Sequence, residues 1–211
     1  MRLKKVKNAQ LIIKEGKYYI SNPEEYKGTW NKLFNNNSPI KIEIGMGKGD
    51  FIIENALKCP HINFIGIEKF DSVIARAIQK SNELELDNLK LIRMDALNID
   101  NIFNKEIDTI YLNFSDPWPK ERHAKRRLTN PIFLEKYDKI FKNNKHIIMK
   151  TDNIDLFNYS QESLTNYGYT IIYKTNNLHK EKDIDNIMTE YEKKFVKLGI
   201  KINKLEAIKK K

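Results

Sequence analysis

The sequence predicts an α/β protein in which βαβ units are wound into a parallel sheet. Short apolar runs rich in β-branched residues alternate with segments of helical period from residue 39 onward, which is typical of such units. A glycine-rich turn directly follows the first of these runs, at residues 45–49. The chain has 211 residues, 40% of them hydrophobic, and this suffices to bury one substantial core.

Seven apolar runs are the expected strands. They occupy residues 39–44, 62–68, 89–94, 107–114, 146–150, 169–174 and 187–198. The first 38 residues lack this alternation, so we expect a basic and partly ordered N-terminal arm at 1–38. One domain is expected over 39–200. The lysine-rich end of the chain, 201–211, is expected to be a basic tail.

Two of the intervening segments have a clear helical period, at residues 70–84 and 131–141. The apolar residues that share a face are Val73, Ala77 and Ile78 in the first segment and Phe133, Tyr137, Ile140 and Phe141 in the second. Asn130 followed by Pro131 predicts the start of the second helix, because proline loses no hydrogen bond at the first helical position.

Composition restricts the partners of the protein. A net charge of +10 and a pI of 9.4 favour a polyanionic partner, since lysine and arginine release counterions when they neutralise phosphates. Cys59 is the single cysteine, so no internal disulfide forms, and the four histidines lack metal-ligand spacing. The apolar patch near the N-terminus is too short for a signal or a membrane span. We therefore expect a cytoplasmic protein without a metal or a membrane partner; monomer and homodimer both stay open.

Acidic residues lie at or directly after the ends of five successive predicted strands. They are Glu43, Glu68, Asp95, Asp116 and Asp152. A single acid at such a position is usually a helix cap or a turn residue. Five on the rim where parallel α/β sheets bind ligands predict a crevice of like charges, which would be costly without a compensating ligand. We expect that ligand to be cationic or rich in hydroxyl and amino donors.

The glycine loop indicates which cofactor this crevice holds. Gly45, Gly47 and Gly49 lie between the first strand and the first helix, where glycine permits a tight turn and a close approach to the main chain. The spacing is GxGxG, whereas dinucleotide sites use GxGxxG. Glu43 beside the loop would repel a pyrophosphate but attract the ammonium and sulfonium of S-adenosylmethionine. Glu68 is then expected at the ribose hydroxyls and Asp95 at the adenine amino group.

The stretch at residues 112–129, LNFSDPWPKERHAKRRLT, follows the fourth predicted strand. Asp116 falls at the crevice, and prolines on both sides of Trp118 are expected to stiffen its loop. The positive residues directly after it are Lys120, Arg122, His123, Lys125, Arg126 and Arg127. A charge run of this kind is usually a solvated loop, but its place next to a candidate catalytic acid favours phosphate binding and a nucleic-acid substrate.

These motifs resemble one family, the bacterial tRNA (guanine-N7-)-methyltransferases. The motifs are NFSDPWPKERHAKRRLT at 113–129, EIGMGKG at 43–49, KTDN at 150–153 and TEYE at 189–192. The resemblance implies a Rossmann-like class I methyltransferase fold, with helices on both faces of a mostly parallel seven-stranded sheet whose last strand is antiparallel. It also implies methylation of guanine N7 at position 46, in the variable loop of tRNA.

The resemblance also implies roles for individual residues. Glu43, Glu68, Asp95 and Asp116 match the cofactor contacts of the family, and Asp116 matches its catalytic residue. The matches to substrate contacts are Lys120, Asp152, Thr189, Glu190, Tyr191 and Glu192. Arg122 to Arg127 match the loop that contacts RNA.

Three other functions are compatible with parts of the pattern. The SDPW stretch resembles the loop of enzymes that methylate an exocyclic amine of a nucleic-acid base. A dinucleotide-dependent dehydrogenase is disfavoured by Glu43 and by the glycine spacing. A non-catalytic RNA-binding module would have the same basic surface, but it would not need acids along the strand ends.

Overall fold

The computed structural model describes residues 5–181 and 186–210 and contains a seven-stranded sheet. The strands are β1 Ile40–Ile44, β2 Asn63–Glu68, β3 Leu89–Arg93, β4 Ile107–Asn113, β5 Lys145–Thr151, β6 Thr170–Thr175 and β7 Asn203–Lys209. Their order in the sheet is β3-β2-β1-β4-β5-β7-β6, and β7 runs antiparallel to both of its neighbours. This confirms the prediction of a mostly parallel sheet with an antiparallel last strand.

Helices connect the strands. The α-helices are α1 Ala9–Lys14, α2 Trp30–Phe34, α3 Asp50–Lys58, α4 Asp71–Asn82, α5 Ile99–Ile102, α6 Pro131–Ile140, α7 Ile154–Asn166 and α8 Glu190–Lys197. Four short 3-10 helices are η1 Pro23–Tyr26, η2 Ala96–Asn98, η3 Glu121–Arg126 and η4 Leu178–Lys180. Across the part of the chain that is described, none of the helices is long and apolar enough to cross a membrane.

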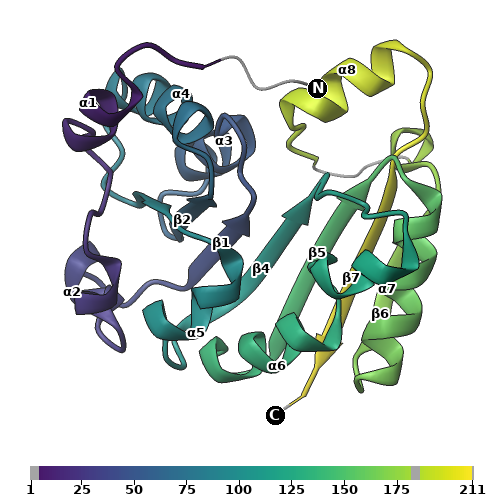
Figure 1. Cartoon of the computed structure of the whole chain (residues 1–211). Coiled ribbons are helices and arrows are strands. Elements are labelled where there is room, and N and C mark those ends of the chain that lie inside the picture. Colours follow the sequence, from purple (N-terminus) through teal and green to yellow (C-terminus); the bar gives the residue numbers. More distant parts are fainter. Residues whose placement is uncertain (1–4, 182–185, 211) are drawn as a thin grey trace.

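Both faces of the sheet carry helices, as predicted (Figure 1). On one face, Ile42, Ile110 and Ile147 pack into a core shared with α6 and α7. On the other face, Phe64 and Leu91 pack against α1, α3 and α4. Asn130 caps α6 by accepting a hydrogen bond from the N–H of Ile132, which confirms the start predicted for that helix.

The chain order creates a switch point between β1 and β4. The chain first builds β1, β2 and β3 outward in one direction and then returns to add β4 on the other side of β1. Glu43 on β1 lies opposite Tyr111 on β4 at this point. Connections on the two sides of a switch point leave in opposite directions, and the crevice that forms beyond the strand ends is the usual ligand site of open α/β sheets.

The prediction of a strand at 187–198 is wrong, because this segment holds α8. Thr189 and Glu192 have the spacing of a helix capping box, and the hydroxyl of Thr189 accepts a hydrogen bond from the N–H of Glu192. The last strand is β7 instead, so Asn203–Lys209 of the predicted tail, 201–211, belong to the sheet. Leu205 and Ala207 of β7 are fully buried in the core.

The N-terminal segment is also better ordered than predicted over its described residues, 5–38. Trp30 is fully buried and its indole N–H donates to the carbonyl of Ile102 at 3.0 Å. Tyr18 and Ile20 exchange main-chain hydrogen bonds with Leu91, so this segment borders the edge of β3. The order of this segment is not evident from the sequence, because its short helices α1, η1 and α2 contain no long periodic run of apolar residues. Residues 1–4 of the predicted arm lie outside the described residues.

Candidate functional site

The glycine loop between β1 and α3 forms one wall of the crevice. The N–H groups of Gly45 and Met46 both donate to the carbonyl of Ile67, which fixes the loop against the end of β2. Gly45 and Gly47 have φ angles of 78° and 61°, in the left-handed region that favours glycine. A Cβ atom at either position would have no neighbour within 4 Å, so this main chain faces open space on the ligand side.

Glu43 lies below this loop and is only 2% exposed. Its Oε1 accepts a hydrogen bond from Nδ2 of Asn113 at 2.8 Å. Its Oε2 and the Oδ1 of Asn113 are buried and have no hydrogen-bond partner among the described residues. Burial raises the pKa of Glu43 to about 8, against the opposing effects of Asn113 and Lys150. Two unsatisfied acceptors side by side are suited to a ligand that donates hydrogen bonds or carries positive charge.

Glu68 ends β2 and organises the main chain around it. Its Oε1 accepts from the N–H groups of Lys69 and Phe70, and its Oε2 accepts from the N–H of Gly47 at 3.1 Å. Burial raises its pKa in spite of these bonds, and the charge of Asp116 adds to the rise. The charge of Glu68 also contributes to the raised pKa of Glu43, so Glu43 lies near Glu68 and Glu68 lies near Asp116.

Asp95 and Asp152 lie nearer to solvent than Glu43 and Glu68. Asp95 follows β3 and caps η2 through the N–H of Leu97. Its Oδ2 also pairs with the ammonium of Lys69 at 2.6 Å. Although burial acts in the opposite direction, these hydrogen bonds lower the pKa of Asp95. Asp152 is exposed directly beyond the end of β5.

Asp116 is exposed in the middle of a strained loop. Phe114 and Trp118, two residues before and after it, have φ angles of 51° and 44°. Bulky residues rarely adopt this region, and each such residue costs on the order of 1–3 kcal/mol. The surroundings must therefore hold both ends of the loop. Backbone strain of this kind is found preferentially at functional sites.

The first end of the loop is held by β5 and α8. The N–H of Phe114 donates to the carbonyl of Lys150 at 2.8 Å. The ring of Phe114 stacks on Tyr191, with centroids 6.4 Å apart and planes 19° apart, and also contacts Phe195. Tyr191 remains 45% exposed, so this aromatic cluster of Phe114, Tyr191 and Phe195 keeps an accessible edge.

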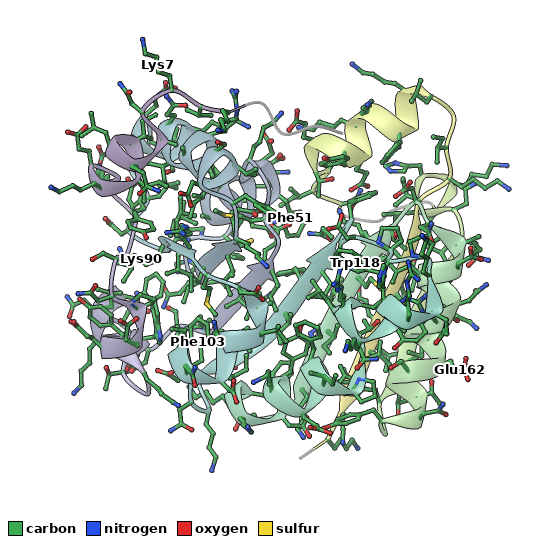
Figure 2. The ribbon with its side chains drawn as sticks, in the orientation of Figure 1. Lys7, Phe51, Lys90, Phe103, Trp118 and Glu162 are labelled. Atoms are coloured by element: carbon green, nitrogen blue, oxygen red, sulfur yellow. The ribbon has the colours of Figure 1, made fainter. Side chains whose placement is uncertain are left out.

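The second end of the loop is held by the basic run that follows it. The guanidinium of Arg126 lies 4.8 Å from the centroid of the Trp118 ring, and the His123 ring is perpendicular to the same ring, with centroids 5.8 Å apart. Arg127 donates to the carbonyls of Pro117 and Trp118. In Figure 2, Trp118 lies on the α7 side of the end of β4, whereas Phe51 lies on the α3 side.

The basic run is divided by burial. Lys120, Arg122, Lys125 and Arg126 are exposed, and His123 is half-buried. Arg127 is only 8% exposed, because it points back under the loop. The predicted RNA-binding group therefore has an outward part and one member, Arg127, that does not face solvent.

The TEYE segment is anchored by a buried ion pair. The ammonium of Lys150 lies 2.6 Å from Oε2 of Glu192, and it also donates to the carbonyl of Ile187. Oε1 of Glu192 contacts His179 and Asn186. Glu192 is completely buried, so a direct contact with a substrate, which the sequence predicts, would require this network to open.

The other residues of the TEYE segment face outward to different degrees. Thr189 is buried as the cap of α8. Glu190 pairs with Lys48 of the glycine loop at 2.5 Å, and this bridge spans the crevice from one wall to the other. Figure 1 shows α8 beyond the tip of β4, over the carboxyl ends of the strands. Of the four predicted positions, Glu190 and Tyr191 are the ones a ligand in the crevice can reach.

Three residues of the site were not predicted from the sequence. Asn113 and Lys150 lie within the quoted motifs, but no role was assigned to them. His179 lies outside the motifs. Their partners are 70, 42 and 13 residues away in the chain, so no local spacing indicates them. Within the described ranges, no group of three or more His, Cys, Asp and Glu side chains is placed to hold a metal ion.

Comparison with known proteins gives a consistent result. Residues 37–205 match a family model described as "Putative methyltransferase". A tRNA (guanine-N(7)-)-methyltransferase of Lachnoclostridium phytofermentans is 48% identical over 213 residues, with both chains covered completely. One of Bacillus cytotoxicus, with the same name, is 50% identical over 209 residues, which cover 98% of this chain and 96% of the relative.

Solved structures share the fold at low sequence identity. An antibiotic-related methyltransferase superposes with a TM-score of 0.62 at 17% identity, covering 87% of this chain and 94% of the other. The 16S rRNA methyltransferase KamB has the same TM-score and coverage at 10% identity. These structures bear on the fold alone.

Proposed function

The chain belongs to the family of tRNA (guanine-N(7)-)-methyltransferases, and from this premise we propose that it methylates N7 of a guanine in tRNA, with S-adenosylmethionine as the methyl donor. The guanine is that of the variable loop, at position 46, as the motif resemblance implies. We also propose that the protein acts in the cytoplasm, on the tRNA found there.

One observation carries the proposal more than any other. Glu43, Glu68 and Asp116 lie at or just beyond the ends of β1, β2 and β4, three strands that are neighbours in the sheet around the switch point. A strained loop presents Asp116 to the crevice, and a positive surface follows it directly. An acidic pocket beside a basic surface is suited to a cationic methyl donor and a polyanionic substrate.

The residues present fit the methyl donor. S-adenosylmethionine would supply an electrophilic methyl group on a sulfonium centre. Glu43 and Asn113 offer two buried acceptors to the ammonium of such a donor. Glu68 uses three of its lone-pair sites on main-chain N–H groups, which leaves a site for a ribose hydroxyl. Gly45 and Gly47 leave the space that the donor needs beside the main chain.

Methylation of guanine N7 requires little acid–base chemistry from the protein. N7 has an in-plane lone pair and no hydrogen, so no general base has to expose it, and alignment is the main requirement. As N7 is alkylated, positive charge develops on the purine. Asp116 is an exposed carboxylate that can stabilise this charge or hold the N1 and N2 donors of the base. Tyr191 offers an exposed ring on which the base can stack.

The tRNA is bound by the outward part of the basic run. Lys120, Arg122 and Lys125 are exposed next to the loop of Asp116, and the chain carries a net charge of +10. Lysine and arginine at such positions bind phosphates and set the register of the nucleic acid without reading its sequence.

The direct test uses purified protein, bulk unmodified tRNA and methyl-labelled S-adenosylmethionine. We expect the label at one guanine, at which reduction and aniline treatment then cleave the strand. Label on an exocyclic amine gives no cleavage and would favour the amine methyltransferase. Absence of label, with tRNA binding intact, would favour the non-catalytic RNA-binding module.

A variant tests the role of Asp116. Asp116→Ala should retain tRNA binding and donor binding but lose about 100-fold or more in kcat, because the missing carboxylate acts on charge that develops in the transition state. Asp116→Asn, which keeps the shape and the hydrogen-bonding oxygen, separates charge from positioning. A kcat for Asp116→Ala within a few-fold of wild type would remove Asp116 from the mechanism.

A further inference from the structure

We propose that Arg127 is a positioning residue for the loop of Asp116 and not a contact for RNA. The inference rests on the proposed function, because it concerns the same loop and the same reaction. It assigns Arg127 a role different from that of the exposed basic residues directly before it in the sequence.

The contacts of Arg127 point inward to the loop. Its Nε donates to the carbonyl of Pro117 at 3.2 Å, and its Nη2 donates to the carbonyl of Trp118 at 3.1 Å. These are the two residues directly after Asp116. A planar guanidinium has its donors in a fixed fork, so one side chain fixes two successive carbonyls and with them the direction of the main chain.

Arg127 is itself tied to α7. Its guanidinium lies 4.3 Å from the centroid of the Tyr159 ring. Nearby, the hydroxyls of Thr129 and Ser160 are hydrogen-bonded at 2.8 Å, and the hydroxyl of Ser163 donates to the carbonyl of Thr129. The segment that carries Arg127 is therefore bonded to a regular helix, and Arg127 transmits this fixed position to the loop.

The loop has particular need of such a contact. Trp118 adopts a φ of 44°, which its own side chain disfavours, so the native conformation persists only because external contacts hold it. Arg127 bonds to the carbonyl of this residue. Without that bond the main chain at 117–118 can relax, and the carboxylate of Asp116 moves with it.

Burial separates this role from RNA binding. Arg127 is 8% exposed, and both of its bonds are to the protein itself. A phosphate contact would have to replace these bonds. Arg122, five residues earlier, is exposed and is the natural comparison, because it has the same side chain in the same basic run.

The experiment compares Arg127→Ala and Arg127→Lys with Arg122→Ala, and uses Arg76→Ala on the exposed surface of α4 as the matched control. Steady-state kinetics with tRNA give kcat and KM, and filter binding at several salt concentrations gives the salt slope. Circular dichroism checks folding. Arg127→Lys, which keeps the charge but cannot fork to two carbonyls, decides the matter if Arg127→Ala does not fold.

Both Arg127 variants should lose about 100-fold in kcat, the size of effect expected when a reacting group is misplaced by about 1 Å, with the salt slope unchanged. Arg122→Ala should instead raise the KM for tRNA and reduce the salt slope by about one. Quenching of tryptophan fluorescence by acrylamide adds a structural readout. The chain has two tryptophans, and because Trp30 is fully buried, a change in quenching reports on Trp118. Greater quenching in the Arg127 variants is expected.

The opposite pattern would overturn the inference. If the Arg127 variants keep kcat at saturating tRNA and lower the salt slope, Arg127 binds RNA phosphate. Failure of the proposed function looks different, because wild-type protein and Arg76→Ala would then also fail to methylate tRNA.

Discussion

The two walls of the crevice are constructed differently. On the wall formed by β1, β2 and β3, two of the three acids are held mainly by nearby main chain: Glu68 accepts three N–H groups from residues 47, 69 and 70, and Asp95 caps η2. Glu43 is the exception, because the side chain of Asn113 donates to it. On the wall formed by the loop after β4 and by α8, strained main chain is held by side chains from distant segments. Arg127 and the pair of Lys150 and Glu192 are the main examples.

This difference separates binding from positioning. The first wall is fixed by turns that form wherever a strand passes into a helix, so it is suited to a ligand site that is present before the substrate arrives. The second wall depends on a few buried polar contacts, and each of them holds a segment that faces the substrate. We therefore expect changes in the second wall to cost both stability and turnover, and changes in the first wall to affect ligand binding foremost.

The largest effect on stability is expected for Lys150→Met. This change leaves Glu192 completely buried without its cation, and breaking a buried ion pair in this way costs about 3–5 kcal/mol. Urea denaturation measures the loss. The second wall should also loosen, so that kcat falls in whatever protein remains folded.

The double variant Lys150→Met with Glu192→Met is the control for this prediction. Replacing a buried pair by apolar side chains of similar volume is often nearly neutral, so the double variant should recover much of the loss. A single variant that costs less than about 1 kcal/mol would mean that the pair is hydrated, and the contrast between the walls would then weaken.

A smaller effect of opposite sign is expected for Glu43→Gln in the first wall. Burial raises the pKa of Glu43 to about 8, so between pH 4.5 and about 8 the folded protein binds more protons than the unfolded chain. Stability of the wild type therefore falls as pH rises through this window and levels off above it, by up to about 3 kcal/mol at pH 7. Glu43→Gln should remove this pH dependence and raise the melting temperature of the ligand-free protein, while it weakens donor binding.

Asp95→Asn is the matched control for Glu43→Gln, because the pKa of Asp95 is lowered and not raised. Its variant should be slightly less stable than wild type at neutral pH, and the difference should disappear as the pH falls below the ordinary range of an aspartate. Thermal melts from about pH 2 to about pH 9 compare the two variants and include the acidic range in which the contribution of Asp95 is lost. If Glu43→Gln is less stable than the wild type at every pH, burial of the Glu43 carboxylate is not the cost that this prediction assumes.

The difference between the two walls also explains which features could be predicted from the sequence. The strands from β1 to β6, the acids at their ends and the glycine loop were predicted because period, turn residues and local spacing determine them. The strand predicted at 187–198 is wrong although Thr189 and Glu192 carry a helix-start signal, because this segment begins with apolar and β-branched residues like those of the other predicted strands. The inward direction of Arg127 could not be predicted, since its partners Pro117 and Trp118 become neighbours only when the loop folds back.

The smallest effect is expected where the two walls meet at the surface, for Lys48→Ala. Lys48 and Glu190 are about one-third and one-half exposed, and such pairs contribute about 0–1 kcal/mol. We expect Lys48→Ala to change the free energy of unfolding by less than about 0.5 kcal/mol, and the change should vanish at 1 M salt because exposed charges are screened there. A double-mutant cycle with Glu190→Gln measures the coupling. A coupling energy as large as that of Lys150 and Glu192 would mean that the two walls form one cooperative unit. An exposed ion pair is that strong only when the two segments it joins are rigid relative to each other.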